Sequence, residues 1–258
     1  MTTAAFRSAL SAGDLTLGTF VLEFASPGIG SIAAGAGADW ILYDLEHTGW
    51  STDRVAASIA VSRREEIATF VRVAGPAQHL VSGALDAGAE GIMMPYVNSA
   101  EQAAQIVSWM KYPPMGIRGS AFGIAHDLYR SGDPAGKQAA ANASTVFLPQ
   151  IETPEAVAAA HDIAAVDGVD VLFVGPFDLS TNLGAPGDFT TPEFRAALTT
   201  VAEAARAHGK AAGIFSGSPA LSALAVELGY RVVSHTGDVA IFQQALRTGL
   251  ADIRALLG

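Results

Sequence analysis

Short apolar runs alternate along this chain with longer segments in which apolar residues recur every three or four positions. The short runs are typical of buried parallel strands, and the longer segments are typical of amphipathic helices. The expected strands are residues 15–24, 40–43, 69–73, 91–94, 146–151, 169–174, 211–215 and 231–234. Strands and helices in this alternation predict a (β/α)8 TIM barrel, with residues 1–258 as one α/β domain. The competing fold is a doubly wound open sheet, but no GxGxxG motif follows any early strand.

Two segments depart from the simple alternation. Residues 112–142 contain several prolines and glycines, so we expect an elaborated loop with a short helix there. The closing segment, 238–257, is an expected helix with a continuous apolar stripe. The stripe consists of Val239, Phe242, Leu246, Leu250, Ile253 and Leu257. It either covers its own barrel, as the eighth helix of a barrel normally does, or packs on another subunit.

Composition narrows the class of protein. The chain is 50% hydrophobic and only 16% charged, which predicts an extensive buried core. Its net charge of −10 argues against nucleic acid as a partner. Neither a membrane-spanning stretch nor a signal-peptide core is present, so we expect a cytoplasmic protein without membrane contact. The absence of cysteine excludes disulfides, thiolate metal sites and a cysteine nucleophile.

Polar side chains gather where the expected strands end. In a TIM barrel the carboxyl ends of the strands carry the active site. The residues at these ends are Asp44, Glu46, His47, Arg72, Gln150, Glu152, Asp178, Ser216 and His235. We therefore expect a site at one end of the barrel.

Glu152 and Asp178 are separated by one complete β-α-β unit, so their strands are expected to be parallel neighbours. Neighbouring strands lie about 4.8 Å apart, which allows two carboxylates at matching ends to bind one cation. Two carboxylates and water suit a hard divalent ion, Mg²⁺ or Mn²⁺, with Co²⁺ as a further candidate. The alternative is that each residue only caps a helix or a loop.

A candidate base and a candidate anion-binding residue lie at the same end. His47 is a candidate general base, and either Asp44, three residues before it, or Asp86 on a nearby helix is a candidate partner that raises its basicity. Arg72 either pairs with Glu46 or holds a substrate oxyanion with its planar fork.

Two other aldolase chemistries are disfavoured. A Schiff-base enzyme needs a lysine inside the barrel, whereas Lys111, Lys137 and Lys210 lie outside the expected strand ends. A zinc enzyme needs clustered imidazoles, whereas the six histidines are scattered.

Several motifs occur in one order along residues 15–240. They are Asp44-Leu-Glu-His47, Val71-Arg-Val, Leu85-Asp-Ala-Gly-Ala-Glu-Gly-Ile-Met-Met-Pro, Tyr112-Pro-Pro-Met-Gly-Ile-Arg-Gly, Gln150-Ile-Glu-Thr and Gly175-Pro-Phe-Asp-Leu-Ser. Together they resemble the metal-dependent (class II) pyruvate aldolases of the 4-hydroxy-2-oxoheptanedioate aldolase (HpcH/HpaI) family. Tyr43, Tyr96 and His235 depart from the smaller or more apolar residues expected at their positions.

The resemblance implies reversible cleavage of a 4-hydroxy-2-oxo acid into pyruvate, or a close 2-oxo acid such as hydroxypyruvate, and an aldehyde. It implies that Glu152 and Asp178 bind the metal, that His47 is the base strengthened by Asp86, and that Arg72 stabilises the enolate. Gln150, Asp178 and the main chain of Phe177 would contact the 2-oxo acid, with Asp44 and Glu46 supporting the site. Relatives exchange the closing helix between paired subunits, so the resemblance also implies a homohexamer built as a trimer of dimers.

Three alternatives remain open at this point. The same enolate site would also serve decarboxylation of a β-keto acid of the oxaloacetate type. The segments Ser216-Gly-Ser-Pro and Thr236-Gly-Asp either bind a phosphate group or simply cap two helices, and we favour the caps because no arginine or lysine is close in sequence. The chain could also bind a ligand without turnover, which a complete set of ligands, base and oxyanion donor argues against.

Overall fold

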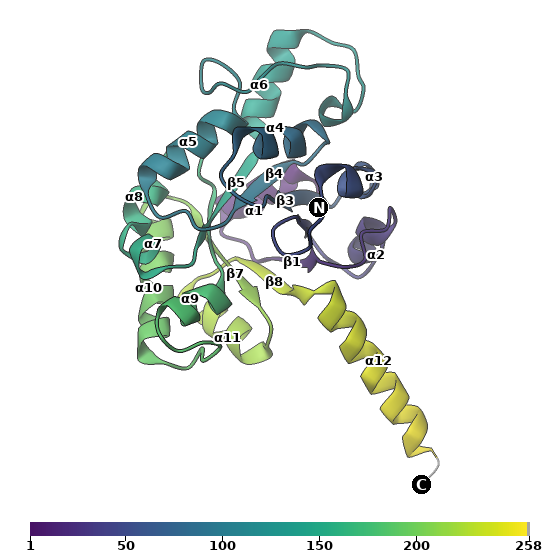
Figure 1. Cartoon of the computed structure of the whole chain (residues 1–258), viewed down its shortest axis with the longest axis vertical. Coiled ribbons are helices and arrows are strands. Elements are labelled where there is room, and N and C mark those ends of the chain that lie inside the picture. Colours follow the sequence, from purple (N-terminus) through teal and green to yellow (C-terminus); the bar gives the residue numbers. More distant parts are fainter. Residues whose placement is uncertain (257–258) are drawn as a thin grey trace.

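The computed structural model describes residues 1–256, and within them eight parallel strands close into one barrel. Each strand pairs with the next, and β1 pairs with β8 to complete the ring. The strands are β1 (Thr16–Val21), β2 (Trp40–Asp44), β3 (Ala68–Arg72), β4 (Gly91–Met94), β5 (Val146–Ile151), β6 (Val171–Val174), β7 (Ala211–Ser216) and β8 (Val232–Gly237). The predicted (β/α)8 barrel is confirmed (Figure 1).

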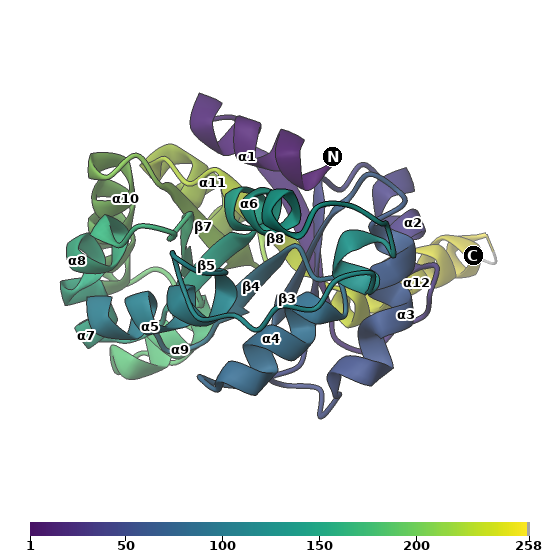
Figure 2. The same ribbon diagram turned by 90° about the horizontal axis from the view of Figure 1, so that it is seen from above.

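The chain also forms helices, most of which lie around the outside of the barrel (Figure 2). They are α1 (Thr3–Ala12), α2 (Ile29–Gly35), α3 (Thr52–Ser62), α4 (Gln78–Asp86), α5 (Ala100–Met110), η1 (Ala125–Asp127), α6 (Pro134–Ser144), α7 (Pro154–Ala158), α8 (Ala160–Ala165), α9 (Pro176–Asn182), α10 (Pro192–Ala207), α11 (Pro219–Leu228) and α12 (Asp238–Ala255). Among the described residues, no helix combines the length and apolarity that crossing a membrane requires.

Aromatic side chains fill the inside of the barrel. Trp40 is fully buried and packs edge-on against Phe20 and Phe173. Gly18 on β1 lies directly over the Trp40 ring, so a side chain at this position would collide with the indole. At the amino end of the strands, Phe6 of α1 packs against Phe70 with ring centroids 5.1 Å apart. This contact closes that end, and α1 and α9 lie on opposite sides of the barrel in Figure 2. The other end is left open for the site.

The structure corrects several details of the expected elements. The helix after Glu152 is divided at Ala159 into α7 and α8, while its cap is as predicted, with the Thr153 hydroxyl accepting from the Ala156 amide at 3.0 Å. Helix α9 was not predicted, although Pro176 stands at its first turn, where proline is favoured. The irregular segment between α5 and β5 contains η1 and all of α6.

Helix α12 projects away from the barrel in Figure 1. Every residue from Val239 to Leu256 is exposed, including the stripe residues Phe242 (56%) and Ile253 (62%). Phe242 packs edge-on against Phe24 with ring centroids 5.5 Å apart, but the rest of the stripe does not cover its own barrel. Leu257, the last predicted member of the stripe, lies outside the described residues.

Candidate active site

Side chains predicted from the sequence line a single cavity at the carboxyl ends of the strands. The cavity has a volume of about 270 Å³, and Phe20, Leu22 and Phe215 form much of its apolar wall. The predicted residues that line it are His47, Arg72, Gln150, Glu152, Phe177 and Asp178. The structure thus brings together residues from four separate parts of the chain.

Arg72 is locked by a buried carboxylate on the neighbouring strand. Asp44 ends β2 directly opposite Arg72 in β3, and its two oxygens accept from Nε at 2.9 Å and from Nη2 at 2.7 Å. Burial alone would lower the pKa of Arg72, but the hydrogen bonds and charge of Asp44, together with the charges of Glu46 and Glu152, outweigh it, so this pKa is raised. Nη1 is directed toward Gln150 Oε1, at 3.5 Å, and Glu46 Oε2, at 3.1 Å. The guanidinium therefore presents a fixed positive charge to the cavity.

His47 lies on the turn that follows β2. Asp44 shapes this turn by accepting the Glu46 amide at 2.9 Å and, through its carbonyl, the Thr48 hydroxyl at 2.6 Å. The His47 side chain is half-exposed, and its Nε2 lies 3.7 Å from Glu46 Oε2. Burial raises the pKa of Glu46, although the charges of Arg72 and His47 oppose this rise. Within the described residues, the carboxylate paired with His47 is Glu46.

Glu152 and Asp178 lie side by side at the adjacent strands β5 and β6. Glu152 is 1% exposed, and its oxygens accept from Gln150 Nε2 at 2.9 Å and from the Tyr96 amide at 3.0 Å. Asp178 Oδ1 accepts from the Tyr96 hydroxyl at 2.7 Å. Burial raises the pKa of Glu152 to about 8, with the Tyr96 amide opposing the rise and the neighbouring Asp178 adding to it.

The start of α9 determines where Asp178 lies. Gly175 is the N-cap of this helix, and any side chain there would collide with the Glu152 carboxylate. Pro176 then begins the helix, so Asp178 falls in its first turn. The Phe177 ring packs on Phe189 and Phe215 at the cavity rim, with centroid distances of 5.2 and 6.4 Å.

The predicted contact between Asp86 and His47 is not formed within residues 1–256. Asp86 ends α4, five residues before β4 begins, and therefore lies at the amino end of the strands. There it accepts from Arg118 Nη2 at 2.7 Å. Asp44, the other candidate partner, is bound to Arg72. Asp86 is close to β4 in sequence, but this proximity did not reveal that the end of α4 that carries Asp86 lies away from the site.

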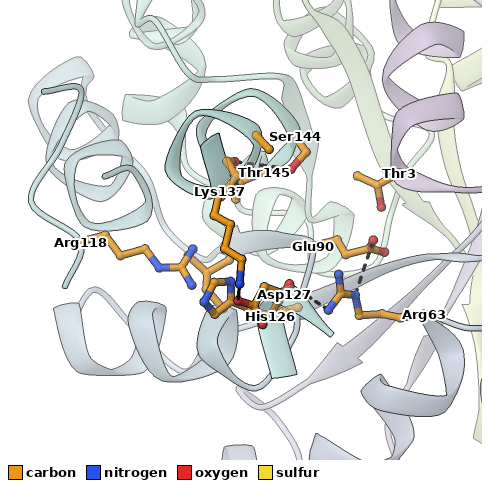
Figure 3. Close-up of a pocket in the computed structure, with 13 residues that line it drawn as sticks. Thr3, Arg63, Glu90, Arg118, His126, Asp127, Lys137, Ser144 and Thr145 are labelled. Carbon is orange, nitrogen blue, oxygen red and sulfur yellow. Dashed lines mark hydrogen bonds and ion pairs between the residues drawn. The ribbon is translucent and has the colours of Figure 1, made fainter. Parts of the chain in front are cut away.

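A second polar cavity, of about 200 Å³, lies at the amino end of the strands (Figure 3). Its cationic side chains already have carboxylate partners. Arg63 pairs with Glu90 at 3.6 Å, and Lys137 pairs with Asp127 at 2.6 Å. Lys137 and Asp127 both belong to the long segment between α5 and β5, and Arg63 attaches this segment to the barrel by donating to the Ala125 carbonyl at 2.8 Å.

Ser216 and His235 do not join the site. Ser216 donates to the Ser218 carbonyl at 3.0 Å, and the Ser218 hydroxyl caps α11 by accepting from the Leu221 amide at 3.2 Å. His235 instead borders an apolar groove between β1, α2 and α12. Asp238 accepts the amides of Leu22, Glu23 and Phe24. The first segment therefore caps a helix, as the simpler interpretation holds, whereas α12 begins at Gly237 without a side-chain cap.

The donor set beside the cavity fits a hard divalent cation. Glu152 and Asp178 supply carboxylate oxygens from adjacent strand ends, and Mg²⁺ and similar ions are often held by one or two carboxylates together with water or substrate. Within residues 1–256, no group of three or more histidine, cysteine, aspartate or glutamate side chains is arranged to bind a metal. The protein would therefore leave several coordination positions to small molecules.

Comparison with known proteins agrees with this arrangement. The family model described as HpcH/HpaI aldolase/citrate lyase matches residues 17–245. A hydroxypyruvate/pyruvate aldolase from Roseovarius nubinhibens is 35% identical over 98% of this chain and 97% of its own length. A 4-hydroxy-2-oxovalerate aldolase from Novosphingobium aromaticivorans is 39% identical over 95% of this chain and 92% of its own.

A solved structure shares the fold over nearly the whole chain. The HpcH/HpaI aldolase/citrate lyase family protein from Burkholderia cenocepacia has a TM-score of 0.90 at 31% identity, covering 97% of this chain and 99% of the other. The chain belongs to the HpcH/HpaI aldolase/citrate lyase family, and it is a carbon–carbon lyase. The predicted family resemblance is confirmed.

One residue at the site was not predicted to take part in it. Tyr96 was noted only as a departure from the family pattern, yet it contacts both Glu152 and Asp178. Its position two residues after β4 is the signal that could have identified it. β4 otherwise contributed no polar residue to the expected end of the barrel.

Proposed function

We propose that this protein catalyses the divalent-metal-dependent, reversible aldol cleavage of a 4-hydroxy-2-oxo acid into a 2-oxo acid and an aldehyde. The 2-oxo acid is pyruvate or a close analogue such as hydroxypyruvate. The observation that carries the proposal is the convergence of Glu152, Asp178 and Arg72 on one cavity with His47. The names of the aldolase relatives from Roseovarius and Novosphingobium support the substrate class.

Each side chain has a role that its surroundings support. Glu152 and Asp178 would hold a Mg²⁺, Mn²⁺ or Co²⁺ ion, which supplies Lewis-acid polarisation of the 2-oxo group. Arg72 stabilises the negative charge that develops on the 2-oxo oxygen as the bond between C3 and C4 breaks, because Asp44 keeps its guanidinium fixed. Gln150 and the main chain of Phe177 orient the 2-oxo acid.

His47 carries out the proton transfer. Its imidazole accepts the 4-hydroxyl proton and later returns a proton toward C3, as histidine side chains do in general acid–base catalysis. Glu46, 3.7 Å away, stabilises the imidazolium that forms. Within one chain, Asp86 accepts from Arg118 and does not reach His47. Asp86 can therefore have its predicted role in this step only if the Asp86 of a second subunit lies beside His47.

A pyruvate-release assay tests the proposal. The protein is treated with EDTA, and pyruvate formation from 4-hydroxy-2-oxo acids is followed with and without added Mn²⁺. We expect turnover only with the metal, and we expect borohydride with pyruvate to leave activity intact. Borohydride trapping of a pyruvate adduct on Lys111, Lys137 or Lys210 with loss of activity would instead indicate a Schiff-base enzyme.

We also infer that α12 is exchanged between subunits of a homohexamer. An apolar groove of about 550 Å³ runs beside the start of α12, between β1 and α2. Leu17 and Ile32 in this groove are 46% and 66% exposed. The stripe on α12 and the groove are both apolar and both uncovered, and a second copy of this chain offers each of them a matching surface.

A further inference from the structure

Tyr96 contacts both carboxylates of the candidate metal centre. Its backbone amide donates to Glu152 Oε2 at 3.0 Å, and its hydroxyl donates to Asp178 Oδ1 at 2.7 Å. Glu152 follows β5, whereas Asp178 belongs to α9 after β6. A single residue, two positions after the end of β4, therefore connects the carboxylates that follow two later strands.

The backbone of Tyr96 is held in a conformation that a tyrosine rarely adopts. Its φ angle is +52°, in the left-handed region that favours glycine and asparagine. Neighbouring contacts maintain this turn. The Val97 amide donates to the Gln150 carbonyl at 3.2 Å, and the Thr153 hydroxyl donates to Asn98 Oδ1 at 2.8 Å. The turn thus stays attached to β5 and directs the Tyr96 amide at Glu152.

The phenol supplies the second contact without occupying the whole of Asp178. Tyr96 is 43% exposed, so burial of this residue does not explain the placement of its phenol. Within the described residues, Asp178 Oδ2 accepts no hydrogen bond, whereas Oδ1 is held by the phenol. Two neighbouring carboxylates repel each other when both are ionised. A neutral donor to each of them offsets part of that repulsion and fixes their orientations.

We propose that Tyr96 is a positioning residue that holds Glu152 and Asp178 ready for a divalent cation. The inference rests on the proposed function, because it assumes that these carboxylates bind the metal. Partners that orient metal ligands typically contribute about 10- to 100-fold to metal affinity or activity. Tyr96 acts through the carboxylates and needs no contact with the substrate.

The test measures Mn²⁺ binding to the full-length, EDTA-treated protein by titration calorimetry. Tyr96→Phe keeps the ring and the backbone amide but removes the hydroxyl. We therefore expect Mn²⁺ to bind at least about 10-fold more weakly. Tyr129→Phe is the matched control. Tyr129 is also exposed, at 69%, and also has a left-handed backbone, with φ of +58°. It borders a different cavity, away from Glu152 and Asp178, so its variant should bind Mn²⁺ like the wild type.

Two further measurements separate positioning from general damage. At saturating Mn²⁺, Tyr96→Phe should recover a kcat within a few-fold of the wild type, while its activation constant for Mn²⁺ stays raised. Tyr96→Asn, which suits the left-handed backbone but lacks the phenol, should weaken Mn²⁺ binding in the same way. Equal Mn²⁺ affinities for the wild type and both Tyr96 variants would overturn the role of Tyr96 alone. A wild type that binds no Mn²⁺ would overturn the metal centre and the role of Tyr96 together.

Discussion

At the scale of single residues, the site depends on donors and acceptors that hold one another. Arg72 is the clearest case, because Asp44 takes Nε and Nη2 and leaves Nη1 facing the cavity. A planar fork of this kind can bind a carboxylate on one side and an oxyanion on the other. Lysine at the same position has the charge but not the fork.

Arg72→Lys should therefore remove most of the cleavage activity while the protein remains folded. Loss of one oxyanion donor typically lowers the rate about 100- to 1000-fold, and oxalate, which resembles the enolate, should bind more weakly. Kinetics and oxalate titration check both effects. Arg63→Lys is the control, since Arg63 pairs with Glu90 at the opposite end of the barrel. Near-normal cleavage with unchanged oxalate affinity would mean that Arg72 serves only as a structural ion pair.

The position of a site residue was predictable where chain direction alone determines it. His47, Arg72, Gln150, Glu152 and Asp178 follow or end parallel strands, so the barrel brings them to one end. Asp86 lies on a helix, where side chains near the two ends face opposite ends of the barrel. Tyr96 was missed because its importance depends on a left-handed turn and on contacts with β5, and neither has a pattern in the sequence.

At the scale of elements, the alternation of strands and helices was predictable because buried parallel strands are continuous apolar runs. Short elements were less predictable from the sequence. Helix α9 spans only Pro176–Asn182, which is too short to show helical periodicity. The segment between α5 and β5 is held by side chains distant in sequence. Lys111, at the end of α5, donates to the carbonyls of Asn142 and Thr145 at 2.7 and 3.0 Å.

Lys111 gives this segment a pH-dependent stability. Burial lowers the pKa of Lys111 from 10.5 to about 8, with the nearby Asp170 opposing the change. Between these two values the unfolded chain binds the proton and the folded chain does not, so this lysine makes folding more favourable as pH rises. The penalty of burying its charge applies below pH 8. From pH 8 to 9.5 the wild type should gain about 2 kcal/mol relative to Lys111→Met.

Urea unfolding at several pH values measures this difference. Lys210→Met provides the comparison, because Lys210 is only partly buried, directly before β7. Its unfolding free energy should follow that of the wild type across the same pH range. Parallel curves for the wild type and Lys111→Met would show that the Lys111 amine is not desolvated in the folded protein.

At the scale of the whole molecule, the barrel is complete except for the surface that an eighth helix normally covers. The chain leaves that surface open as a groove, while its closing helix projects into solvent (Figure 1). The periodicity of α12 was predictable, but its direction was not, because an apolar stripe fits its own barrel or a neighbour equally well. Asp238 determines the departure of the helix by accepting amides from the end of β1.

The last prediction concerns this surface. Apolar burial contributes about 25 cal/mol per Å², so an uncovered stripe and groove should favour association, and light scattering of the intact protein should show six copies of the 26.5 kDa chain. Removing residues 241–258 keeps Asp238 but deletes all of the stripe except Val239, and should give dissociated or insoluble protein. Phe242→Asp should weaken assembly, whereas Gln243→Asp, at the adjacent exposed position outside the stripe, should leave it intact. An active monomer of the unmodified chain at micromolar concentration would show that α12 is not exchanged.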